Sequence, residues 1–289
     1  MNSATNPSTR RRRPVRLTMG IALVTATGLL GLTACDDSDK QREAADGRSD
    51  STVSSTSAPA GTARAGQEPS GAGNKNAKLA KLLWMGDSIG EVEAPALGAA
   101  MKANGTEFKS MAAAGGGGVI GEVAQSTWEE LPKELGSFKP NVVVYQITTY
   151  DWGKAAEQQA SYERLVKTVT DAGAELVIVS APPFRIDDFY KRHEAEIKSA
   201  PKSAKEVADK HPGKVHFLDA AALWGTDSAA AKAQRSNDGI HSCQQGSAAF
   251  ANWLGKELGR QYSFAPAAVD RWATGSWTGD KVYGRLGCK

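Results

Sequence analysis

One serine, one aspartate and one histidine in this sequence have the types and spacing of a catalytic set. Ser88 follows the short apolar run 82–85, and much later in the chain Asp238 stands three positions before His241. A serine hydroxyl is a weak nucleophile until a histidine removes its proton, and a carboxylate beside the histidine orients that base. The three residues therefore predict attack by Ser88 on a carbonyl carbon.

His241 is the only one of the four histidines with an aspartate at this offset. A short turn would let the Asp238 carboxylate reach the ring Nδ1–H and leave Nε2 for the serine. The alternative for this pair is a polar loop, and the alternative for Ser88 alone is a helix N-cap. Of the other histidines, His193 lies in a charged run, His211 precedes a Pro-Gly turn, and His216 lies in an apolar run.

The elements that must position these residues alternate between apolar runs and amphipathic stretches. Strands are expected at 81–85, 108–114, 141–147, 174–180 and 215–218, and helices at 89–104, within 119–135, at 154–172, 187–210 and 245–262. Such alternation favours a parallel sheet with helices on both faces, whose functional residues lie at the carboxyl ends of the strands. Ser88, the glycine run 115–118, residues 148–151 and the pair Asp238 and His241 all follow predicted strands.

The order of these motifs resembles the SGNH/GDSL hydrolase family. That family has Gly-Asp-Ser after its first strand, here ending at Ser88, and Asp-x-x-His near the end of the domain. The serine also fits Gly-x-Ser-x-Gly of the α/β-hydrolases, but there the nucleophile follows a middle strand and the acid is distant from the histidine in sequence. The resemblance covers about residues 80–260. It implies a flavodoxin-like three-layer α/β/α sandwich with a five-stranded parallel sheet.

Such a hydrolase needs hydrogen-bond donors for the oxyanion of its tetrahedral intermediate. The Ser88 amide is one expected donor, and we assign the second to Gly116 or Gly117, because a residue without a side chain lets the backbone approach the substrate closely. The alternative for the four-glycine run is a flexible crossing. The family's Gly-x-Asn-Asp block corresponds here to residues 148–151, where Tyr150 stands in place of the asparagine donor.

The substitution at Tyr150 leaves two functional hypotheses open. The hydroxyl of Tyr150 or Thr149, or the amide of Gln146, could replace the missing donor, and Asp151 could brace the loop. The protein would then be a serine esterase that cleaves or transfers an acyl ester, with envelope carbohydrate or lipid as a substrate suggested by the family and the export signal. Losing one such donor typically lowers the rate by ~10²–10³. The alternative is therefore a non-catalytic binding or scaffold protein with the same fold.

The first 34 residues have the pattern of a bacterial export signal. Five arginines precede an apolar stretch that ends in Leu-Thr-Ala before Cys35. This ending resembles a lipobox and predicts that Cys35 carries a lipid that anchors the protein to the extracytoplasmic face of the cell membrane. The alternative is an ordinary secretory signal. Residues 35–76 hold few large apolar side chains and are expected to form a disordered tether.

The remaining chain is predicted to be a hydrolase domain at 77–262 and an aromatic tail at 263–289. With Cys35 assigned to the lipid, Cys243 and Cys288 remain as an expected disulfide, and free thiols are the alternative. The tail aromatics could form a wall of the substrate site or a packed strap over the sheet edge: Trp272, Trp277 and Tyr283.

Charge and motifs bear on the class of partner. The chain has 35 basic and 32 acidic residues, but five arginines and no acid lie in residues 1–34, which leaves 30 basic against 32 acidic side chains, a net charge of −2. This balance gives no basic footprint for nucleic acid. The sequence has no paired Cys or His motif typical of metal sites and no nucleotide-binding glycine pattern, so no metal or cofactor is expected.

Overall fold

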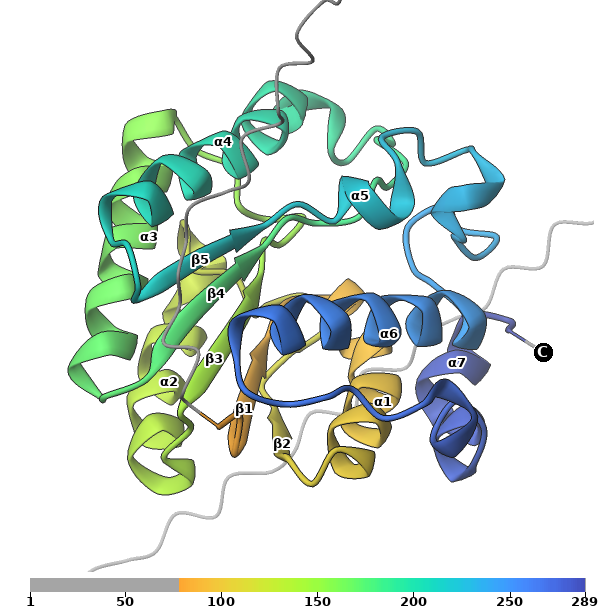
Figure 1. Ribbon diagram of the computed structural model, residues 1–289. Helices are drawn as coiled ribbons and strands as arrows, with labels where there is room; N and C mark the ends of the chain where they lie inside the picture. The colour runs from red at the N-terminus through yellow and green to blue at the C-terminus, as the bar shows by residue number, and fades with distance from the viewer. Residues whose placement is uncertain (1–77, 289) are drawn as a thin grey trace, which may run out of the picture. The chain divides into compact units, whose positions relative to one another are not determined.

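The computed structural model describes residues 78–288 and contains one parallel five-stranded sheet (Figure 1). The sheet has the order β2-β1-β3-β4-β5. This flavodoxin-like order, with helices on both faces, confirms the predicted three-layer sandwich. The predicted export signal, Cys35 and the whole of the predicted tether lie outside the described residues. The strands are β1 (Lys81–Met85), β2 (Glu107–Ser110), β3 (Val142–Gln146), β4 (Glu175–Val179) and β5 (Val215–Leu218).

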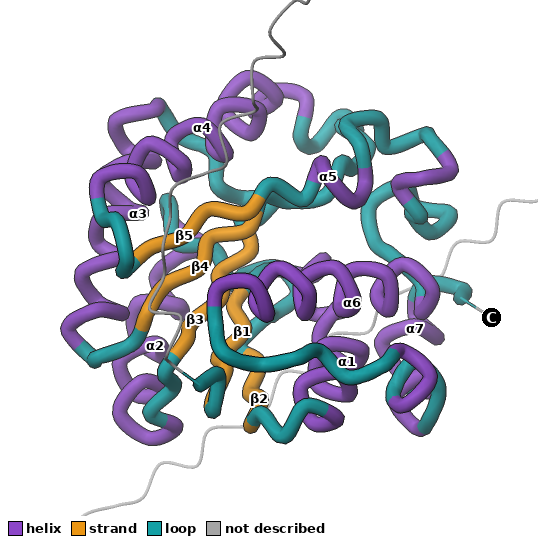
Figure 2. Tube along the Cα trace, viewed as in Figure 1, coloured by secondary structure: helices purple, strands orange, loops and turns teal. Residues whose placement is uncertain are grey.

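Seven α-helices lie in the described part of the chain, and Figure 2 shows them around the sheet. Among residues 78–288, no helix has the length and apolar character needed to cross a membrane. The helices are α1 (Ser88–Ala103), α2 (Gln125–Phe138), α3 (Ala155–Asp171), α4 (Glu194–Lys210), α5 (Ala221–Trp224), α6 (Gln244–Gln261) and α7 (Lys281–Arg285).

Strand β1 shows how the sheet builds two cores. Leu82 and Trp84 pack in a cluster with side chains of α1 and α6, whereas Leu83 and Met85 pack with side chains of α2, α3 and α4. Successive strand residues point to opposite faces, so both sets are buried. This explains why the strand is apolar throughout and why it ends where polar residues begin.

Two predicted elements differ from the structure by four or more residues at one end. Strand β2 covers 107–110 instead of 108–114, and it is an edge strand with no fully buried residue. The helix predicted from 187 begins only at α4, after a 3-10 turn at 191–193. The Asp187 carboxylate accepts hydrogen bonds from the amides of Phe189 and Tyr190, and this local turn competes with helix formation.

The C-terminal tail forms a packed strap against helices α1 and α6. Trp272 and Tyr283 are buried, and the Tyr283 hydroxyl donates to the Val92 carbonyl of α1 at 2.9 Å. The Trp277 ring nitrogen donates to the Trp272 carbonyl at 2.7 Å. Of the two alternatives for these aromatic residues, the structure therefore supports the strap. The strap covers helices rather than the sheet edge, because its apolar side chains join clusters of α1 and α6.

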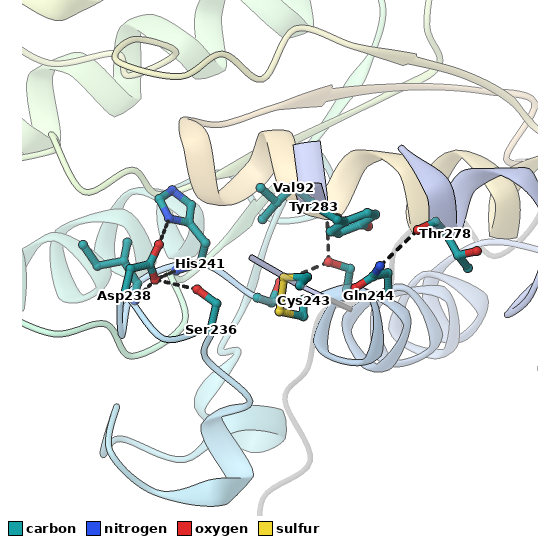
Figure 3. Close-up of a disulfide and its surroundings, with 12 residues drawn as sticks. Val92, Ser236, Asp238, His241, Cys243, Gln244, Thr278 and Tyr283 are labelled. Atoms are coloured by element: carbon teal, nitrogen blue, oxygen red, sulfur yellow. Dashed lines mark hydrogen bonds and ion pairs between the residues drawn. A yellow bond between two sulfur atoms is a disulfide. The ribbon is translucent and has the colours of Figure 1, made fainter. Parts of the chain in front are cut away.

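Cys243 and Cys288 are joined by a disulfide, shown in Figure 3. Cys243 is the N-cap of α6 and follows His241 by two positions. The bond therefore fixes the tail to the beginning of α6, next to the loop that carries Asp238 and His241.

Replacing both Cys243 and Cys288 by serine should lower the free energy of unfolding. The bond closes a loop with a sequence separation of 45, and the entropic model gives a loss of about 4 kcal/mol. Urea unfolding of the oxidised protein and of the double variant measures the difference. The wild type under reducing conditions is the matched control and should behave like the variant. Equal stability of the oxidised protein and the variant would contradict the expectation.

Candidate active site

Ser88, His241 and Asp238 form one hydrogen-bonded chain in the structure. The His241 Nε2 lies 2.9 Å from the Ser88 Oγ, although the two residues are 153 positions apart. The His241 Nδ1 lies 2.7 Å from the Asp238 Oδ2. With the Nδ1 proton held by the carboxylate, Nε2 is free to accept the serine proton. All three side chains are partly accessible to solvent, so a substrate can reach them.

A tight loop before α6 presents Asp238 and His241 together (Figure 3). The Asp238 Oδ1 accepts hydrogen bonds from the Ser236 hydroxyl and from the amides of Ile240 and His241. Gly239 has φ +72°, a left-handed conformation that glycine adopts without strain. Partial burial raises the pKa of Asp238, but hydrogen bonds from His241 and the loop outweigh it and hold the pKa at about 2. The carboxylate therefore stays ionised beside the imidazole at neutral pH.

Asp87 fixes the turn that carries Ser88, and the sequence analysis did not identify it as a site residue. Its side chain is buried and caps α1 by accepting from the Ile89 amide at 2.9 Å. Its other oxygen accepts from the Thr149 amide and hydroxyl, each at 2.7 Å. Burial raises the pKa of Asp87, and these bonds oppose the rise. An aspartate directly before a helix start was the available signal.

The glycine run lies against the turn of the nucleophile. Gly117 has φ +77°, and a Cβ at this position would overlap the Gly86 carbonyl oxygen, so only glycine fits. Within residues 78–288 the Gly117 amide has no hydrogen-bond partner. The Gly116 amide instead donates to the Ala113 carbonyl at 3.2 Å. Gly116 as an oxyanion donor is therefore a prediction that the geometry does not support, because the turn already uses this amide.

The block after β3 commits most of its polar groups to internal bonds. The Gln146 amide donates to Glu93 at 2.7 Å and the Thr149 hydroxyl donates its one proton to Asp87, and both side chains are buried. Asp151 is buried and accepts from the hydroxyls of Tyr145, Thr148 and Tyr162, which is the bracing role expected for it. Burial raises the pKa of Asp151 to about 6 against the opposing effect of these bonds.

Tyr150 keeps a hydroxyl close to this network. Its hydroxyl pairs with that of Tyr190, which lies 3.4 Å from the Thr149 hydroxyl oxygen. Partial burial, followed by the nearby Asp87 charge, raises the pKa of Tyr150, so the phenol is protonated at neutral pH and able to donate. Of the three replacement donors that the sequence suggested, Tyr150 is the one whose side chain is partly accessible to solvent.

The segment 184–190 after β4 also belongs to the site, and the sequence analysis missed it. The Arg185 amide donates to the Gly239 carbonyl, between Asp238 and His241, at 2.8 Å. At its other end, Tyr190 contacts Thr149 of the third block. The segment therefore spans from the loop of the base to the block after β3. The aromatic residues at the carboxyl end of a predicted strand were the available signal.

A second missed feature is an electrostatic interaction between a buried carboxyl group on the helix of the nucleophile and an arginine in the loop of the base. Glu93 on α1 is fully buried, and the positive charge of Arg235 acts on it. The Arg235 guanidinium lies 4.5 Å from the Trp224 ring centre and donates to the Ile240 carbonyl at 3.0 Å. Burial raises the pKa of Glu93 to about 8, although Arg235 and Gln146 lower it. The described residues contain no group of acidic, histidine and cysteine side chains arranged to hold a metal.

No protein-family model matches the chain, and no curated protein matches it in sequence. Several solved structures resemble it. A Bacteroides ovatus protein described as a GDSL-like lipase has 12% identity and a TM-score of 0.50, over 66% of this chain and 56% of its own. An acetyl esterase has 15% identity and a TM-score of 0.49, over 63% of this chain and 97% of its own. A carbohydrate esterase family 3 protein from Talaromyces cellulolyticus has 15% identity and a TM-score of 0.47, over 63% of this chain and 97% of its own.

At such low identity the likeness shows the fold alone. The fold of residues 78–288 is a three-layer α/β/α sandwich, which it shares with the GDSL-like lipase at a TM-score of 0.50. The chemistry of this chain must therefore be argued from its own residues.

Glu93→Gln should change how stability depends on pH. Folding raises the Glu93 pKa from 4.5 to about 8, so between these values the folded protein holds a proton that the unfolded chain releases. The wild type therefore loses stability as pH rises through this window, by up to about 1.4 kcal/mol per pH unit. The variant lacks this titration, so its free energy of unfolding relative to the wild type should increase from pH 5 to pH 8.

Urea unfolding at several pH values measures this effect. Glu91→Gln is the matched control, since Glu91 lies on the same helix but pairs with Arg285 at the surface. If the free energy of unfolding of the wild type and of Glu93→Gln changed with pH in parallel, the expectation would be wrong. Glu93 would then be ionised in the folded protein.

Proposed function

We propose that the protein is a serine esterase that cleaves or transfers an acyl ester through an acyl-serine intermediate. The observation that carries the proposal is the continuous chain of hydrogen bonds from Ser88 to His241 to Asp238, at 2.9 and 2.7 Å. This is the arrangement that nucleophilic catalysis by serine requires. The sequence blocks and the three-layer fold together support membership of the SGNH/GDSL family.

In the first half-reaction, the Ser88 Oγ forms a bond to the ester carbonyl carbon while His241 Nε2 takes the hydroxyl proton. The carbonyl oxygen becomes an oxyanion. The Ser88 amide, in the first turn of α1, has no partner within the helix and is one donor for it. The Gly117 amide is the second donor and the Tyr150 hydroxyl is the third. The C–O bond to the alcohol then breaks, and His241 gives the proton to the departing oxygen.

In the second half-reaction, the acyl group leaves Ser88. His241 removes a proton from water or from an acceptor alcohol, whose oxygen attacks the acyl carbon, and then returns the proton to the serine oxygen. Attack by water completes hydrolysis, and attack by another alcohol completes acyl transfer. Both outcomes use the same residues, so the ionised Asp238 stabilises the imidazolium in each.

We also propose that the enzyme acts outside the cytoplasm, anchored to the cell membrane through a lipid on Cys35. The support is the arginine-rich, apolar segment that ends at this cysteine. A disulfide between Cys243 and Cys288 is consistent with an oxidising compartment. An ester of envelope carbohydrate or lipid is a substrate that would be within reach there.

The purified protein should hydrolyse p-nitrophenyl acetate, and Ser88→Ala should abolish this activity because the nucleophile is lost. Release of p-nitrophenolate measures both. Ser137→Ala, which changes an exposed serine near the end of α2, is the control and should hydrolyse at the wild-type rate. Wild-type activity in Ser88→Ala would place the nucleophile elsewhere. An inactive but folded wild type would favour the non-catalytic binding protein.

Tyr150→Phe tests the third oxyanion donor. Removing the hydroxyl should lower kcat by ~10²–10³ with a smaller effect on KM, because the bond forms in the transition state. Tyr150→Asn should retain more activity than Tyr150→Phe, since an asparagine amide also donates. Steady-state kinetics with p-nitrophenyl acetate distinguishes the variants. An unchanged kcat in Tyr150→Phe would exclude the phenol as a donor.

A further inference from the structure

We propose that an aromatic patch beside Ser88 binds an apolar chain or ring of the ester substrate. The patch consists of Tyr150, Trp152, Phe189 and His193. This inference rests on the proposed esterase function and adds the chemical class of the group that the enzyme selects.

Phe189 is the exposed centre of the patch. Its side chain is 51% exposed, and among residues 78–288 only Val269 is another large apolar residue that is exposed. The Phe189 ring contacts the Trp152 ring edge-on, with centroids 5.9 Å apart, and the Tyr150 ring at 6.5 Å. Trp152 in turn stacks on His193 at 4.0 Å. Adjoining aromatic rings left open to solvent are typical of ligand sites rather than of isolated surface residues.

The patch is continuous with the catalytic residues. Ile89 and Ile240 are the chain neighbours of Ser88 and His241, and both belong to a cluster with Phe184 and Tyr190. Trp152 packs against the same cluster. Apolar contacts therefore connect the chain neighbours of Ser88 and His241 to the patch. A group attached to the ester carbonyl or to its alcohol oxygen could follow these contacts to Phe189.

The segment that presents Phe189 is held in place before any ligand arrives. The Asp187 carboxylate accepts from the Phe189 amide at 3.0 Å, and the neighbouring Tyr190 ring lies 4.9 Å from the Phe189 ring. The Arg185 amide bonds to the Gly239 carbonyl. This bond joins the segment 184–190 to the loop that carries His241. A ligand that binds at Phe189 therefore needs to order little of the protein, which favours affinity.

The ring spacing indicates the size of the group. The Tyr150 hydroxyl is assigned to the oxyanion, and the Phe189 ring centre lies 6.5 Å from the Tyr150 ring centre. A methyl group next to the reacting carbonyl would not extend that far, whereas a chain of several carbons or an aryl ring would. Each methylene that the patch covers should raise kcat/KM about fourfold.

The test measures kcat/KM in two series of esters. In one series the acyl group of a p-nitrophenyl ester is lengthened from acetyl to butyryl and hexanoyl. In the other, acetate is kept and the alcohol is lengthened from ethyl to butyl and hexyl. The series in which kcat/KM rises with length identifies whether the acyl or the alcohol part lies on the patch. In that series, Phe189→Ala should lower the ratio of kcat/KM for the six-carbon ester to kcat/KM for the two-carbon ester at least tenfold. Phe189→Leu should retain most of this ratio.

Val269→Ala is the control, because it removes the other exposed large apolar side chain and should leave the ratio as it is. A wild type that prefers the shortest ester in both series would overturn the proposal while leaving the esterase function intact. An unchanged ratio in Phe189→Ala would overturn it as well.

Binding separates failure of the patch from failure of the esterase function. In the Ser88→Ala background, calorimetry with p-nitrophenyl hexanoate should show binding that Phe189→Ala weakens about tenfold. If the wild type shows no turnover of any ester, binding of this kind would support the patch and exclude the esterase function. Equal binding with and without Phe189 would exclude the patch, whatever the turnover of the wild type.

Discussion

The site is organised around a buried carboxyl group, that of Asp87. A carboxylate without water must have its oxygens hydrogen-bonded, and Asp87 meets this need with the Ile89 amide on one oxygen and the amide and hydroxyl of Thr149 on the other. These bonds join the turn after β1 to the turn after β3. Ser88 is therefore held at the beginning of α1, next to the block that contains Tyr150, by the same bonds that make burial of Asp87 tolerable.

The base reaches the serine through contacts made elsewhere in the fold. Arg235 bonds to the Ile240 carbonyl and so braces the loop of His241, and its positive charge acts on the buried Glu93 of α1. The disulfide of Cys243 fixes the other end of that loop. Positioning of this kind limits the motion between nucleophile and base, which is the main requirement for proton transfer at 2.9 Å.

The sequence alone predicted the sheet and its strands, and it predicted that Ser88, Asp238 and His241 act together, because strand periodicity and short motifs are local signals. It did not predict the contacts that depend on which distant side chains meet. Nothing near Arg185 indicates that its amide bonds to Gly239, and nothing near Glu93 indicates that the charge of Arg235 acts on it. Gly116 and Gly117 looked equivalent because the sequence does not reveal which amide a turn already uses.

The central claim is that Ser88 is an activated nucleophile. Labelling of the native protein with a fluorophosphonate, followed by peptide mass spectrometry, tests it most directly, because the reagent reports activation of a serine oxygen without requiring the natural substrate. We expect one adduct, on Ser88, that forms far more slowly in His241→Ala. A folded protein that forms no adduct, or that is labelled on another serine, would show that Ser88 is not an activated nucleophile.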